Sequence, residues 1–122
     1  MVAKPPATVV AAVFAAGAMA VPIIAKFEGY RPIGYKDPAP GAFDTICYGH
    51  KQAGVSGKTF TPAQCGQLLA NDAVAHGIDV AGCVPDDTPP GPRAAFTSFA
   101  FNIGAAAFCK STMAAKARAH DW

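Results

Sequence analysis

Residues 27–50 read FEGYRPIGYKDPAPGAFDTICYGH, and this stretch decides the fold. Glu28 closes an apolar run and is followed by Gly29, which is typical of the last turn of a helix. The segment 30–36 favours an extended strand, and the Pro- and Gly-rich passage after it turns the chain back into a second strand over 43–48. The stretch therefore predicts a helix followed by a β-hairpin.

Three side chains of this stretch are candidates for chemistry. Glu28 at the helix end and Asp37, nine residues further on, can face each other across a cleft, with Thr45 entering from the return strand. Two carboxylates and a hydroxyl suit the hydrolysis of a glycosidic bond. The spacing by itself also fits solvated surface charges, as in a non-enzymatic periplasmic module anchored to a membrane, because Glu and Asp are common on protein surfaces.

The order of these residues resembles the active-site signature of the phage-type lysozymes, glycoside hydrolase family 24. The resemblance rests on Glu-Gly at 28–29, Tyr-Lys-Asp at 35–37, Thr-Ile-x-x-Gly-His at 45–50 and a second block within 98–112. The second block is similar to the endolysins of lambda-like phages in particular. The family implies a mainly helical α+β fold, with a small hairpin lobe and a helical lobe. It also implies that the protein cleaves the β-1,4 bond between N-acetylmuramic acid and N-acetylglucosamine in peptidoglycan for host lysis, without a cofactor.

The resemblance also implies a role for each catalytic residue. Glu28 is expected to be the general acid, kept protonated near neutral pH by partial burial. Asp37 is expected to be the ionised partner that steers a water molecule to the anomeric carbon, and Thr45 to hold that water. In such an inverting arrangement the two carboxyl groups lie about 6.5–9.5 Å apart.

Four further residues receive roles in the same way. Phe101 matches a position that lines the saccharide cleft. Ser111 matches a position that contacts substrate, although it fits equally well as the N-cap of a helix over 112–119. His50 is placed to meet Asp72 as a structural ion pair, with a catalytic His50 as the alternative.

A long helix is expected to join the two lobes. After a hairpin lobe over 26–60, Thr61 fits an N-cap and Gln64 completes a capping box for a linking helix over 61–80. The remainder, 81–122, is expected to form a helical lobe. Members of the family continue for some tens of residues beyond this point, so the helical lobe is expected to be truncated. A catalytically defective prophage remnant that only binds peptidoglycan is therefore the alternative function.

The N-terminal segment, residues 1–25, is predicted to be a signal-anchor or a signal peptide. Residues 8–25 form an uncharged run of 18 residues that is rich in Ala and Gly, which is the lower limit for crossing a bilayer. Lys4 and the triplet 18–20 fit a cleaved signal peptide. The resemblance favours an anchor that holds the protein at the host inner membrane and later releases it, and either way residues 26–122 reach the periplasm. A buried core helix is disfavoured because the run is apolar on all sides.

Composition and cysteine usage agree with one exported domain. The chain has 122 residues, 52% of them hydrophobic, and a net charge of +2 with no basic run, so a monomer that does not bind nucleic acid is expected. The cysteines lack the short spacing of a zinc site, so no metal is expected, and disulfides suit the periplasm. Of the three possible pairings, the one that ties each lobe to itself is preferred, namely Cys47 with Cys65 and Cys83 with Cys109.

Overall fold

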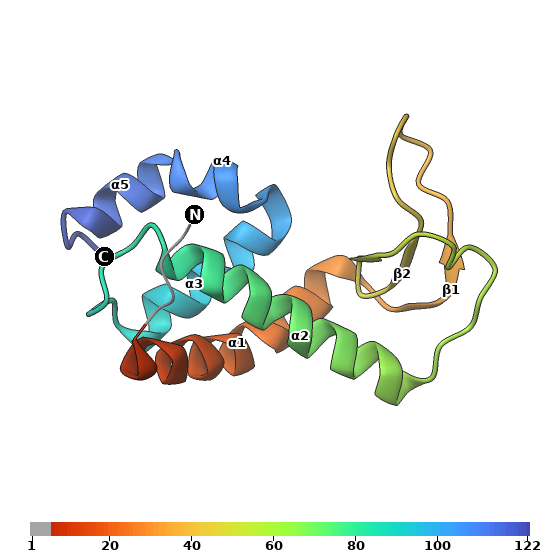
Figure 1. The fold of residues 1–122 in the computed structure, drawn as a ribbon, viewed down its shortest axis with the longest axis horizontal. Helices are drawn as coiled ribbons and strands as arrows, with labels where there is room; N and C mark the ends of the chain where they lie inside the picture. The colour runs from red at the N-terminus through yellow and green to blue at the C-terminus, as the bar shows by residue number, and fades with distance from the viewer. Residues whose placement is uncertain (1–5) are drawn as a thin grey trace.

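The computed structural model of the chain describes residues 6–122. Its elements, in order, are α1 (Ala7–Glu28), β1 (Arg31–Tyr35), β2 (Thr45–Cys47), β3 (His50–Lys51), α2 (Pro62–Ala81), α3 (Pro90–Ile103), α4 (Ala105–Cys109) and α5 (Thr112–Arg118). The sheet lies at one end of α2 and the helices α3, α4 and α5 lie toward the other, so α2 links a small β lobe with a helical lobe (Figure 1). The predicted mainly helical α+β fold is confirmed.

Helix α1 crosses the boundary that the sequence placed after residue 25. It packs against both α2 and α3 (Figure 1). The side chains of one face are buried, at Val9, Val13, Ala16, Ala20 and Ile24. One face of α1 is therefore packed as core, although a buried core helix was disfavoured from the sequence. The reason is that small residues let α1 lie close to its neighbours, so an all-apolar helix can bury one face and expose another. The division of the chain after residue 25 stays a prediction.

Helices α1, α2 and α3 meet at Gly77 of α2, which is buried. A Cβ atom built on Gly77 would lie 3.0 Å from Cγ1 of Val13 and 3.7 Å from Oγ1 of Thr97. A glycine costs an isolated helix about 1 kcal/mol relative to alanine. Here that local cost is offset by the close approach of three helices.

The β lobe contains one strand more than the predicted hairpin. Strands β1 and β2 are antiparallel, with Tyr35 opposite Thr45 and an irregularity along the ladder. The short strand β3 pairs with β2 on the other side, and the return strand is shorter than expected. The loop before α2 runs along the free edge of β1, where Gly34 N donates to Lys58 O at 2.8 Å. This loop protects a strand edge that would otherwise present unpaired backbone groups.

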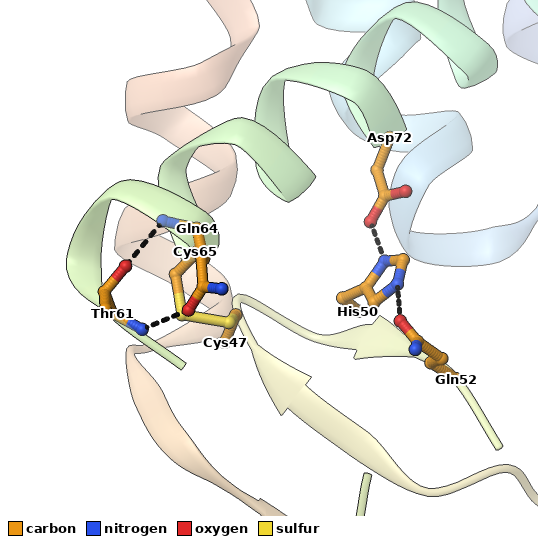
Figure 2. The surroundings of a disulfide bond; sticks show 7 residues. All are labelled: Cys47, His50, Gln52, Thr61, Gln64, Cys65 and Asp72. Atoms are coloured by element: carbon orange, nitrogen blue, oxygen red, sulfur yellow. Dashed lines mark hydrogen bonds and ion pairs between the residues drawn. A yellow bond between two sulfur atoms is a disulfide. The ribbon is translucent and has the colours of Figure 1, made fainter. Parts of the chain in front are cut away.

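Helix α2 begins as the sequence predicts. Thr61 Oγ1 accepts from Gln64 N at 3.1 Å, and Thr61 N donates to Gln64 Oε1 at 2.8 Å, so both halves of the capping box are present (Figure 2). The helix ends at Ala81. Further along, α3 begins at Pro90 and the short helix α4 at Ala105.

The two disulfides have the preferred pairing. The first fastens the β lobe to α2, and the second joins two parts of the helical lobe. Cys47 of β2 is bonded to Cys65 in the first turns of α2, with their Cα atoms 5.0 Å apart (Figure 2). Cys83, just beyond the other end of α2, is bonded to Cys109 of α4, with a Cα separation of 5.6 Å. The first disulfide thus cross-links α2 to the β lobe, and the second closes the helical lobe beyond the end of α2.

A buried arginine organises the entry to α3. Arg93 has no exposed surface, and its Nη2 donates to the carbonyl oxygen of Asp86 at 3.2 Å. Burial lowers the pKa of the Arg93 guanidinium, and the Asp86 carboxylate offsets part of this change. The loop between α2 and α3 is therefore held by the side chain of Arg93, a charged group that is fully buried.

Candidate active site

Glu28 is the last residue of α1, as the sequence predicts. Gly29 caps the helix with φ +74°, and Gly29 N donates to Ala25 O at 3.2 Å. Glu28 lines a pocket of about 580 Å³ between α1 and α3, together with Ile23, Phe27, Ser98 and Phe99, among others. The Glu28 side chain is exposed. The expectation that this carboxyl group is partly buried is therefore wrong for the structure, in which Glu28 lines the pocket but stays exposed to solvent.

The Glu28 carboxylate lies directly against Gly49, the glycine of the Gly-His pair. A Cβ atom at Gly49 would stand 2.6 Å from Glu28 Oε2. The backbone of Gly49 has φ +70°, a conformation that other residues rarely adopt. Glycine is thus needed at this position both by the turn and by the neighbouring carboxylate.

A second pocket, of about 400 Å³, lies between the lobes and is called here the inter-lobe pocket. It is lined by Gly49, His50 and Lys51 of the β lobe, Asp72 and His76 of α2, and residues 101–104 at the end of α3. Phe101 and Asn102 line both this pocket and the one beside Glu28. The two pockets therefore adjoin at the end of α3, with Glu28 and Gly49 on the opposite side of the junction.

His50 and Asp72 form the expected pair on the wall of the inter-lobe pocket. His50 Nδ1 lies 2.7 Å from Asp72 Oδ2, and His50 Nε2 lies 3.2 Å from Gln52 Oε1. Figure 2 shows the imidazole ring held between these two side chains. Both ring nitrogens are engaged, so this geometry favours a structural His50 that fixes the β lobe to α2.

Phe101 lines both pockets, and its contact with a saccharide stays a prediction. It is partly buried, and its ring centroid is 5.1 Å from that of His76 on α2. Ser111 instead caps α5: its Oγ accepts from Ala114 N at 3.1 Å and donates to Phe108 O. Ser111 lines neither of the two pockets, so its N-cap alternative is confirmed and its contact with substrate stays a prediction.

Asp37 and Thr45 lie toward the same end of the hairpin, where the chain turns. Thr45 is opposite Tyr35, and Asp37 follows two residues after Tyr35. Asp37 Oδ1 accepts from Ala39 N at 2.9 Å, in the turn. Thr45 is 5% exposed, and its hydroxyl makes one long bond, to Phe43 O at 3.5 Å. Neither residue lines the two pockets, so the facing of Asp37 and Glu28 across the cleft remains a prediction.

Several pocket residues were not identified as functional from the sequence. Gly49 could have been considered, since glycine is the residue that adopts a positive φ at least cost in a turn. Lys51, His76 and Asn102 come from three different elements, and only the packing brings them to one pocket. Among residues 6–122 there is no group of three or more His, Cys, Asp or Glu side chains that could hold a metal ion.

Two lobes joined by one long helix, with a glutamate at the junction of two pockets, place the chain among the lysozyme-like α+β proteins. The family model described as Phage lysozyme matches residues 25–122. The chain belongs to the phage lysozyme family.

Relatives and solved structures agree with this assignment. The chain is 37% identical over 95 residues to the SAR-endolysin of Bacteriophage PS119, which covers 77% of this chain and 56% of that protein. It is 35% identical over 95 residues, with the same shares, to the SAR-endolysin of Enterobacteria phage P21. The chain thus spans about half the length of the curated relatives it matches.

Among solved structures, the muramidase domain of SpmX from Asticaccaulis excentricus matches with a TM-score of 0.72 and 28% identity, over 84% of this chain and 69% of that one. The endolysin from Escherichia coli O157:H7 phage FAHEc1 matches with a TM-score of 0.69 and 25% identity, over 87% and 66%.

Proposed function

We propose that the chain carries the catalytic residues of an endolysin that hydrolyses the β-1,4 bond between N-acetylmuramic acid and N-acetylglucosamine in peptidoglycan, and so lyses the host cell. The observation that carries this proposal is the position of Glu28 beside Gly49, where two pockets adjoin. A glycan chain that runs from one pocket to the other passes Glu28 at the junction. Hydrolysis of a glycan needs a carboxyl group at that point along the cleft.

Glu28 acts as the general acid that protonates the leaving glycosidic oxygen. Asp37 is the ionised partner that steers a water molecule to the anomeric carbon, and Thr45 orients that water, with inversion at the anomeric centre. Phe101 offers its ring to a sugar face at the junction. Ser111 contacts the glycan beyond this point.

The exposure of Glu28 in the free protein gives substrate binding a further role. A glycan seated in the pocket covers the Glu28 carboxyl group, and burial favours the uncharged form of a carboxylic acid. The substrate therefore helps to maintain the acid that cleaves it. The same exposure supports the competing function, a remnant that binds peptidoglycan without cleaving it.

Helix α1 has the length and composition of a helix that can anchor a protein in a membrane. It is the one helix among the described residues that is long and apolar enough to cross a bilayer. Its unburied face carries large apolar side chains, at Phe14, Met19, Ile23 and Phe27. The chain is first held at the host inner membrane by α1 and is later released into the periplasm, where the other face of α1 packs as core.

The test is the release of reducing sugar from purified peptidoglycan by the full chain, with Glu28→Gln in parallel. A shortened protein that starts at residue 26 is unsuitable because it lacks the buried face of α1. Release that Glu28→Gln abolishes supports the muramidase. Binding to peptidoglycan without release by either protein supports the remnant.

A further inference from the structure

The inter-lobe pocket is lined by a lysine that forms no ion pair with any side chain of residues 6–122. Lys51 lies on β3, is exposed, and lines this pocket. Over residues 6–122 the ion pairs join His50 to Asp72, Lys116 to Asp121 and His120 to Asp87, and none of them includes Lys51.

The other charged groups of the pocket are already occupied. Asp72, the acidic residue among those that line it, is 2.7 Å from His50 Nδ1, and the second ring nitrogen of His50 faces Gln52 at 3.2 Å. Asp72 is paired with His50 in this structure, and Lys51 forms no ion pair with it. The ammonium group of Lys51 is therefore available to a ligand.

The opposite wall of the pocket has a different character. Phe101 and Ile103 are apolar, and Asn102 adds an amide that can donate and accept. The Nδ1 atom of His76 is buried and has no hydrogen-bond partner among the described residues. A ligand that fits has a largely uncharged body and one anionic group directed toward β3.

We propose that Lys51 binds a carboxylate carried by the muramyl units of peptidoglycan and so selects a peptidoglycan strand over an uncharged glycan. This inference rests on the proposed function. A muramyl unit carries a lactyl ether that ends in a carboxylate when bare, and in a peptide with its own carboxylates when substituted. Polymers of N-acetylglucosamine alone carry neither. A carboxylate is the ligand that a free ammonium group pairs with most directly.

The experiment compares the binding of the full chain to three glycans. They are intact sacculi, sacculi whose stem peptides have been removed by an amidase, and insoluble chitin, each measured by cosedimentation at low and high salt. The variants are Lys51→Gln, Lys51→Arg to retain the charge, and Lys58→Gln as the matched control. Lys58 is an exposed lysine of the same lobe that lines neither pocket. Circular dichroism checks that each variant is folded.

Lys51→Gln is expected to weaken binding to intact sacculi about three- to tenfold at low salt, as for one partly exposed charge pair. The difference should shrink at high salt because the pair is screened. Chitin binding should not change, Lys51→Arg should retain most of the affinity, and Lys58→Gln should match the wild type. If the loss disappears on peptide-free strands, Lys51 binds a carboxylate of the stem peptide; if it persists, Lys51 also binds the lactyl carboxylate that the amidase exposes.

The proposal is overturned if Lys51→Gln binds intact sacculi as the wild type does, or loses chitin binding to the same degree. Wild-type protein that cleaves sacculi while Lys51→Gln is unchanged rejects the inference alone. Wild-type protein that neither binds nor cleaves sacculi rejects the proposed function and this inference together.

Discussion

The carboxylate of Glu28 occupies the space in which a side chain at Gly49 would begin, with Oε2 2.6 Å from the ideal Cβ position. Gly49→Ala would push this carboxylate away from the junction of the pockets. A displacement of that size at a reacting group lowers the rate about 10- to 100-fold. The release of reducing sugar by purified protein measures the effect.

The control for Gly49→Ala is Gly54→Ala. Gly54 also has a positive φ, +79°, but a Cβ atom there would meet nothing within 4 Å. Both changes carry the strain of an alanine at positive φ, about 1 kcal/mol of stability. Only Gly49→Ala should also lose activity, and an equal loss in both variants would refute the steric explanation.

Gly34 should be the glycine of the β lobe that is least tolerant of substitution. A Cβ atom at Gly34 would overlap the carbonyl oxygen of Val55, where the loop before α2 crosses β1. Gly34→Ala is expected to lower the free energy of unfolding by about 1–3 kcal/mol or more, because a backbone must move. Urea denaturation measures this.

Gly66→Ala should have the opposite effect. Gly66 lies in α2, and a Cβ atom there would meet nothing within 4 Å. The substitution should stabilise the protein by up to about 1 kcal/mol, because alanine favours a helix more than glycine does.

The His50–Asp72 pair can be separated from catalysis by a double-mutant cycle. At 2.7 Å this bond joins β3 to α2 and is partly shielded from water. Asp72→Asn and His50→Ala are each expected to destabilise the protein by about 1–3 kcal/mol. Together they should cost less than the sum, since both remove one interaction. If His50 is instead catalytic, His50→Ala will abolish activity while Asp72→Asn leaves most of it.

Cys47, which forms the disulfide with Cys65, has an unfavourable backbone conformation. Cys47 has φ +63°, which is rare for a residue other than glycine. Replacing both cysteines by serine is expected to destabilise the protein by about 2–4 kcal/mol. Cys47→Gly combined with Cys65→Ser should cost about 1 kcal/mol less, because glycine adopts this φ freely. Equal thermal unfolding midpoints for the two double variants would contradict this account.

Local signals predicted much of this fold. Gly29 marked the end of α1, and the capping box at Thr61 fixed the start of α2. These features depend on a few neighbouring residues, so they can be read from the chain. The strand β3 could not be predicted, because it is two residues long and exists only through its partner β2.

The candidate site shows the same division. The resemblance to the phage-type lysozymes identified Glu28, His50 and Asp72, whereas Lys51 and His76 became candidates only when packing brought them to one pocket. The burial of α1 was missed for a related reason. Its composition is apolar on all sides, and only the close approach at Gly17 and Gly77 reveals which face is core.

Two neighbouring isoleucines can test whether α1 has both a membrane role and a core role. Ile24 is 2% exposed and Ile23 is 42% exposed, although they have the same side chain. In the released protein Ile24→Ala should lower the free energy of unfolding by about 2–5 kcal/mol, whereas Ile23→Ala removes little packing and should have a much smaller effect. In a membrane both side chains meet lipid, so the two changes should weaken retention in the inner membrane equally. Cell fractionation measures retention, and thermal unfolding measures stability. If α1 only serves as core, retention will not respond to Ile23→Ala; if α1 only serves as an anchor, the two variants will have the same stability.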